Sequence, residues 1–127
     1  MAEEETTEFD YKAHANSLKD EGNEAFQLGT DEGTQRAILL YSQAIDLDPD
    51  NHVFYSNRSA AFLKSDSKSK ALYDAEKCVQ LAPTWIKGYQ RLGAAQQSLK
   101  RFSQAIDNFK KALGNLYLSC SRVIYKL

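Results

Sequence analysis

The sequence predicts an all-α fold in which three helix-turn-helix repeats stack into a right-handed superhelix. Pro49 and Pro83 lie 34 residues apart, and each ends a segment with helical periodicity. Small and large apolar residues recur at matching offsets in three segments: Ala37, Tyr41 and Ala44; Ala71, Ala75 and Cys78; Ala105, Phe109 and Ala112. A fixed period of about 34 residues is typical of stacked helix pairs, in which small residues allow close approach and large ones fill the space between repeats.

Composition limits the function classes. The 127 residues fit one domain, and 43% hydrophobic with 26% charged residues is typical of a folded globular chain. The net charge of −1 argues against binding nucleic acid through a basic surface. No window reaches the roughly 18 apolar residues that a membrane span needs. The acidic N-terminus does not resemble a secretory signal.

The cysteines and the absence of catalytic motifs indicate a binding protein. Cys78 falls where the repeat needs a small buried residue, and Cys120 shows no metal-ligand spacing with it, so we expect a buried free thiol at Cys78. A reducing compartment, the cytoplasm or the nucleus, follows. There is no phosphate-binding loop and no zinc-protease motif. The carboxylates at 46, 48 and 50 are interpreted as a helix end, so we expect no enzyme activity, no cofactor and no metal.

Pattern changes divide the chain into three parts. Residues 1–12 are expected to form a disordered acidic leader, and residues 13–114 the three-repeat domain. Residues 115–127 form an atypical capping segment or tail. Leu116, Cys120, Val123 and Leu127 have the spacing that a capping helix would use, and a strand-like or disordered tail is the alternative.

The helices follow from apolar periodicity and turn residues. Leu18, Gly22, Ala25 and Phe26 mark the first helix, and Gly22 is expected to allow a close helix crossing. The first repeat has three residues more than the others, and we place them in a turn over residues 28–34. The remaining helices are expected at residues 35–47, 53–64, 69–81, from 86 onward, and 102–113.

Five polar residues are predicted to share one groove: Lys19, Asn23, Asn57, Lys87 and Arg91. They lie on the first helices of the three repeats, and at about 100° per residue they fall within one sector about 100° wide. Lysine and arginine attract carboxylates, and asparagine amides donate to carboxylate oxygens without adding charge. A peptide that ends in aspartate, with two neighbouring carboxylates, fits this set. The alternative is that each cation is a solvated surface charge.

Three sequence runs carry a family resemblance: residues 18–23, residues 51–60 and residues 83–95. They resemble tetratricopeptide-repeat co-chaperones that have a two-carboxylate clamp, and in particular the first repeat domain of the heat-shock organising proteins. The resemblance covers about residues 15–113. It implies that Lys19, Asn23, Asn57, Lys87 and Arg91 all occupy clamp positions.

The resemblance also implies partners, namely the Glu-Glu-Val-Asp C-termini of cytosolic heat-shock protein 70 and heat-shock protein 90, with the 70-kDa class preferred. Charge and hydropathy, as above, give no reason to expect nucleic acid or a membrane as a partner. Ala60, Leu63 and Lys64 could form a selectivity shelf for the ligand, and the alternative is that Ala60 and Leu63 pack between repeats. Two other functions stay open. The chain could be the targeting domain of a larger phosphatase, prolyl isomerase or ubiquitin ligase, or it could be a repeat scaffold.

Overall fold

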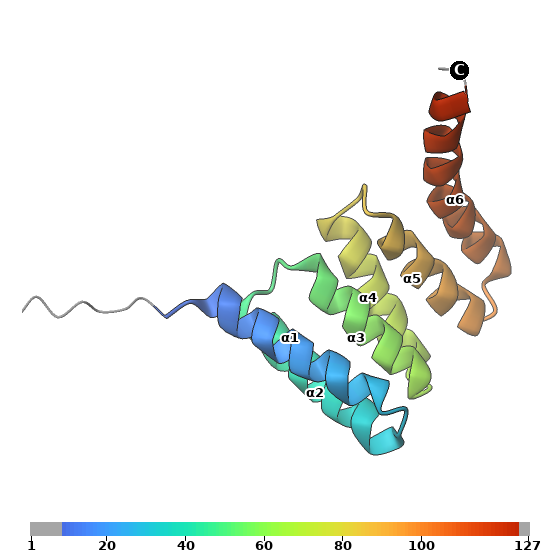
Figure 1. The fold of residues 1–127 in the computed structure, drawn as a ribbon. Coiled ribbons are helices and arrows are strands. Elements are labelled where there is room, and N and C mark those ends of the chain that lie inside the picture. Colours follow the sequence, from blue (N-terminus) through green and yellow to red (C-terminus); the bar gives the residue numbers. More distant parts are fainter. Residues whose placement is uncertain (1–8, 125–127) are drawn as a thin grey trace, which may run out of the picture.

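The computed structural model describes the backbone of residues 9–124 and the side chains of residues 9–114. This part of the chain contains no strand. Its six helices are Tyr11–Gln27 (α1), Asp31–Leu47 (α2), His52–Lys64 (α3), Lys68–Leu81 (α4), Ile86–Ser98 (α5) and Phe102–Ile124 (α6). Figure 1 shows them as three successive helix pairs. The all-α prediction of three helix-turn-helix repeats is confirmed.

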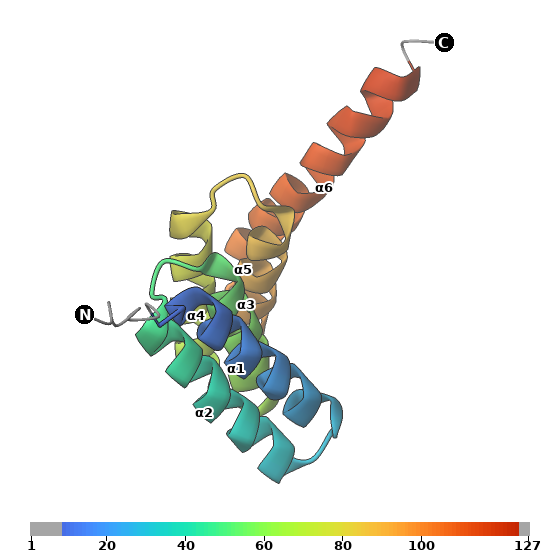
Figure 2. The ribbon, with the colours of Figure 1, turned by 60° about the vertical axis from the view of Figure 1, so that its left-hand side comes forward.

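The first helices of the three pairs form one layer. Within each repeat α1 packs on α2, α3 on α4 and α5 on α6, while α2 contacts α3 and α4 contacts α5. Helix α3 also contacts both α1 and α5. The helices α1, α3 and α5, called here the first-helix layer, therefore lie side by side (Figures 1 and 2). All five predicted groove residues belong to this layer.

In the first and third helix pairs, a glycine on one helix packs against an aromatic ring on the other. A Cβ atom on Gly22 would lie 2.6 Å from the Tyr41 ring, and one on Gly93 would lie 2.6 Å from the Phe109 ring. The two glycines thus let an aromatic ring lie directly against the backbone of the partner helix, as the sequence predicted for Gly22. In the middle repeat both equivalent positions are small, because Ser59 and Ala75 occupy them, and both residues are buried.

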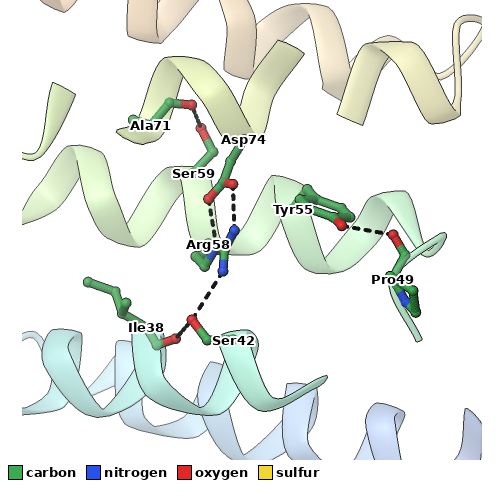
Figure 3. A network of polar contacts seen from close by, with 8 residues as sticks. All are labelled: Ile38, Ser42, Pro49, Tyr55, Arg58, Ser59, Ala71 and Asp74. Atoms are coloured by element: carbon green, nitrogen blue, oxygen red, sulfur yellow. Dashed lines mark hydrogen bonds and ion pairs between the residues drawn. The ribbon is translucent and has the colours of Figure 1, made fainter. Parts of the chain in front are cut away.

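Buried polar contacts fix the middle repeat (Figure 3). The Arg58 guanidinium donates to both carboxylate oxygens of Asp74, each at 2.8 Å, and also to Ser42 Oγ at 3.2 Å. One arginine on α3 therefore joins α2 and α4. Asp74 is fully buried, and a charge in that position is tolerated only with such a two-pronged partner. This network was not anticipated from the sequence.

Two tyrosines form the same hydrogen bond, each to a proline carbonyl in the turn that precedes its helix. The Tyr55 hydroxyl donates to the carbonyl of Pro49 at 2.8 Å, and the Tyr89 hydroxyl donates to the carbonyl of Pro83 at 2.6 Å. Both tyrosines lie in the first-helix layer, 34 residues apart. The prolines that mark the period in the sequence thus also anchor the helix that follows each of them.

The three extra residues of the first repeat lie in a helix, so their predicted place in the turn over residues 28–34 is wrong. Helix α2 has 17 residues, whereas α4 has 14, and only Leu28 to Thr30 separate α1 from α2. Gly29 takes a positive φ of 71°, which ends α1. Thr30 then caps α2 by accepting the N–H of Gly33 at 3.0 Å. Asp31 in the first turn favours this early start.

Both ends of the repeat domain also differ from the prediction. Helix α1 begins at Tyr11 because Asp10 caps it, so residues 11 and 12 are helical and do not belong to a disordered leader. Helix α6 runs through Gly114 to Ile124 without a break, so residues 115–124 continue this helix and do not form a separate capping helix. Residues 1–8 and 125–127, and the side chains proposed for capping, lie outside the described residues.

Two further expectations concern burial and membranes. Cys78 is a fully buried free thiol, as predicted, and burial raises its pKa to about 11. No described helix is both long and apolar enough to cross a membrane.

We predict that Gly93→Ala lowers the free energy of unfolding by about 1–3 kcal/mol, a cost typical of overpacking, since the new Cβ would overlap the Phe109 ring. Urea unfolding followed by circular dichroism measures this. Gly114→Ala is the matched control, because no atom lies within 4 Å of a Cβ there. Its effect should be stabilising, by up to about 1 kcal/mol of helix propensity. Equal destabilisation by both variants would contradict the close-contact interpretation.

Candidate functional site

Two predicted groove residues contact each other. Asn57 on α3 donates from Nδ2 to Oδ1 of Asn23 on α1 at 3.1 Å. The same Asn23 oxygen accepts the hydroxyl of Tyr41 on α2 at 2.5 Å. Three helices thus meet at one amide oxygen. The contact confirms that the asparagines of the first two repeats face one another.

Arg91, on α5 of the third repeat, lies close to the two asparagines. Its Nε donates to Ser56 Oγ at 3.2 Å, and Ser56 is the residue that precedes Asn57 on α3. Burial lowers the pKa of the Arg91 guanidinium, and the nearby Cys78 and Tyr41 offset part of that effect. Within residues 9–114 no carboxylate forms an ion pair with this half-buried cation. The site therefore presents a partly desolvated positive charge that an anionic ligand could neutralise.

The two lysines lie one helical turn before these residues. Lys19 precedes Asn23 on α1, and Lys87 precedes Arg91 on α5, each by four residues, so each pair shares a helix face. Lys19 is only 23% exposed and lies 3.3 Å from the exposed carboxylate of Asp20. Lys87 is exposed. The structure thus joins Asn23 directly to Asn57 and places Arg91 beside Ser56, with a lysine on each flanking helix.

The three predicted shelf residues have separate surroundings. Leu63 packs against the buried cluster of Ala71, Leu72 and Ala95, which agrees with packing between repeats. The Lys64 ammonium lies 5.2 Å from the centroid of the Phe26 ring on α1, a cation–π contact. Ala60 is half-buried. A ligand shelf at these residues stays a prediction.

Two buried residues that the sequence pattern does not identify form hydrogen bonds with the predicted groove residues. The repeat pattern predicts only a packing role for Tyr41 and assigns no role to Ser56. Both are buried, with 2% and 0% exposure, yet their hydroxyls contact Asn23 and Arg91. A polar tip on a buried tyrosine was the available signal, since such a hydroxyl needs a partner.

Comparison with known proteins places the chain in a family. A family model described as "Tetratricopeptide repeat" matches residues 86–115. The solved second repeat domain of Spaghetti (RPAP3) is 31% identical with a TM-score of 0.75, and the match covers 80% of this chain and 92% of that one. The chain belongs to the tetratricopeptide-repeat family.

Curated relatives at higher identity include chaperone-associated proteins. The chain is 45% identical over 100 residues to "Heat shock protein STI1" of Saccharomyces cerevisiae and 48% identical over 99 residues to "Hsp70-Hsp90 organizing protein" of Triticum aestivum. Each match covers 78% of this tetratricopeptide-repeat chain and 16% of the relative. "Serine/threonine-protein phosphatase 5" of Homo sapiens is 36% identical over 96 residues, which is 76% of this chain and 19% of the enzyme.

Several solved tetratricopeptide-repeat structures that are similar to this chain contain bound peptides. The RPAP3 domain above is bound to the HSP90 peptide SRMEEVD. The second repeat domain of human RPAP3 in complex with the HSP70 peptide SGPTIEEVD is 30% identical with a TM-score of 0.74, over 81% of this chain and 83% of that one.

We predict that the stabilising effect of Tyr41 disappears at high pH. Burial raises the pKa of Tyr41 to about 12 from 10.0, and Arg91 offsets part of the rise. Because the folded pKa is the higher one, the contribution is complete below pH 10 and is lost as pH rises from 10 to 12. Unfolding free energies of wild type and Tyr41→Phe across this range measure it. A difference between the two proteins that stays constant with pH would contradict the prediction.

Proposed function

We propose that this chain is a co-chaperone adaptor module that binds the acidic Glu-Glu-Val-Asp tail of heat-shock protein 70 or 90 through a two-carboxylate clamp. The observation that carries the proposal is the meeting of three repeats in one polar site: Asn23 with Asn57, and Arg91 beside them without a carboxylate partner among the described residues. Such a site can accept an anionic group from a ligand. The peptides in the related RPAP3 structures end in EEVD and supply two neighbouring carboxylates.

In the proposed clamp, different residues bind the two carboxylates of the ligand. Lys19, Asn23 and Asn57 lie on α1 and α3 and offer one ammonium and two amides, which suits the α-carboxylate of the last residue. Lys87 and Arg91 lie on α5 and offer two cations, which suits the aspartate side chain. The guanidinium is half-buried, so its bond to a carboxylate would be stronger than at an exposed site.

The module itself is proposed to be non-catalytic and to act in the cytoplasm. Its proposed contribution is to hold the C-terminal tail of a chaperone. The chain spans only 16% of the length of the organising proteins and 19% of phosphatase 5. The likeness to phosphatase 5 supports a second candidate, in which the same groove targets a linked enzyme to chaperones.

Fluorescence anisotropy tests the ligand. A labelled Met-Glu-Glu-Val-Asp peptide should bind with a micromolar dissociation constant, about −8 kcal/mol, when it has a free C-terminal acid. The same peptide as a C-terminal amide should bind much more weakly, because it loses one of its two terminal carboxylates. Equal binding of the acid and the amide, or no binding of either, would remove the clamp and favour a general repeat scaffold.

Alanine variants test the site residues. Lys87→Ala or Arg91→Ala should weaken binding of the acid peptide by at least about tenfold, because a charge-assisted hydrogen bond contributes roughly 1.5–3 kcal/mol. Arg36→Ala is the matched control, since it removes an equal charge from an exposed position on α2. It should change the dissociation constant by less than about twofold. Rising salt should weaken the wild type progressively. Less than a twofold effect in both clamp variants would refute the assignment.

A further inference from the structure

The Asn23 side chain is held at one end only. Its Oδ1 accepts two hydrogen bonds, from the Tyr41 hydroxyl at 2.5 Å and from Asn57 Nδ2 at 3.1 Å. An amide oxygen has two lone pairs, so both of its acceptor positions are filled. What remains free on this side chain is the NH₂ group. Asn23 can therefore offer only donors to a ligand while these two bonds persist.

The direction of the Tyr41 bond follows from its length. A separation of 2.5 Å lies at the short limit of the O–H···O range, about 2.5–3.0 Å, and below the N–H···O range of about 2.7–3.2 Å. The atom of Asn23 nearest the hydroxyl is therefore its oxygen. Burial raises the pKa of the Tyr41 hydroxyl, and the positive charge of Arg91 offsets part of the rise. The nearby cation favours the arrangement in which the hydroxyl proton points toward Asn23.

Tyr41 cannot itself be a ligand-contacting residue. It is 2% exposed, and its ring covers the backbone of α1 at Gly22, where a Cβ would be 2.6 Å away. The ring is thus locked between α1 and α2, and only its hydroxyl reaches the polar site. A rigid side chain in this place can set the orientation of a neighbour without touching what the neighbour binds.

We propose that Tyr41 is a positioning residue of the clamp: its hydroxyl orients the Asn23 amide with NH₂ toward the ligand, and it thereby favours a peptide ending in a free carboxylate over one ending in an amide. The inference rests on the proposed function. Without the Tyr41 hydroxyl, the Asn23 and Asn57 amides can invert together and still keep a mutual hydrogen bond. The inverted Asn23 presents its oxygen, which repels a carboxylate and accepts from a terminal amide.

A double-mutant cycle tests the inference. The proteins are wild type, Tyr41→Phe, Asn23→Ala and the double variant, each titrated with Met-Glu-Glu-Val-Asp as free acid and as C-terminal amide. Tyr41→Phe should weaken acid binding by about threefold to tenfold, as expected for one neutral hydrogen bond, and should lower the ratio of acid to amide affinity. In the Asn23→Ala background the same change should have less than a twofold effect, because its partner is gone.

Each outcome has a definite meaning. Equal losses for the acid and the amide, or equal losses with and without Asn23, would show a general structural role and overturn the proposal. Tyr73→Phe, at a tyrosine that is 65% exposed on α4, controls for removal of a hydroxyl and should change neither affinity.

A measurement on the free protein separates this inference from the proposed function. The Asn23 side-chain NH₂, observed by ¹⁵N–¹H NMR, should be rigid in wild type and clearly more mobile in Tyr41→Phe. Unchanged order would overturn the role of Tyr41 even if the peptide binds as proposed. If the wild type binds no peptide, the proposed function fails, and the NMR result still decides whether Tyr41 orients Asn23.

Discussion

The polar site depends on a helix contact that leaves no room for a side chain. Because residue 22 is glycine, the Tyr41 ring lies against α1, and its hydroxyl comes within 2.5 Å of Asn23. Any larger residue at this position would push the ring outward and separate the two polar atoms. Apolar packing and ligand chemistry are therefore set by the same contact. The Arg58 network also helps to position the polar site, since it joins α3, which carries Ser56 and Asn57, to α2 and α4.

The fold was predictable because small and large apolar residues recur with a period of about 34 residues. Helix starts and stops were less so, and the two main errors have local causes. A run rich in glycine and threonine at residues 28–34 suggested a long turn, yet Thr30 is a helix cap followed by acidic residues that favour a first turn. Gly114 suggested a helix end, yet one glycine in a helix costs only about 1 kcal/mol, and the apolar residues around it are compatible with continuation.

The sequence was enough to predict which residues share a helix face at the site. It was not enough to predict which side chains contact one another. Helical spacing was enough to group Lys19, Asn23, Asn57, Lys87 and Arg91, because it determines which residues share a side of a helix. It could not show that Asn57 donates to Asn23, since amide orientation depends on partners from other helices. Nor could it show the part of Tyr41, which lies 18 residues from Asn23 and on the other helix of its pair. Contacts between helices depend on crossing geometry, which periodicity leaves open.

The two small residues at the contact positions of the middle repeat make its helices non-interchangeable with those of the first and third repeats. Glycine faces an aromatic ring in the first and third pairs, whereas Ser59 and Ala75 take these places in the second. A recombination event that joined α3 to α2 or α6 would set a serine against a ring, and the reverse exchange would leave a void. In the folded chain each helix therefore fits its own partner better than a helix from another repeat. These matched contacts also limit how this array could grow by duplication of single helices, because only whole repeats carry a matched pair.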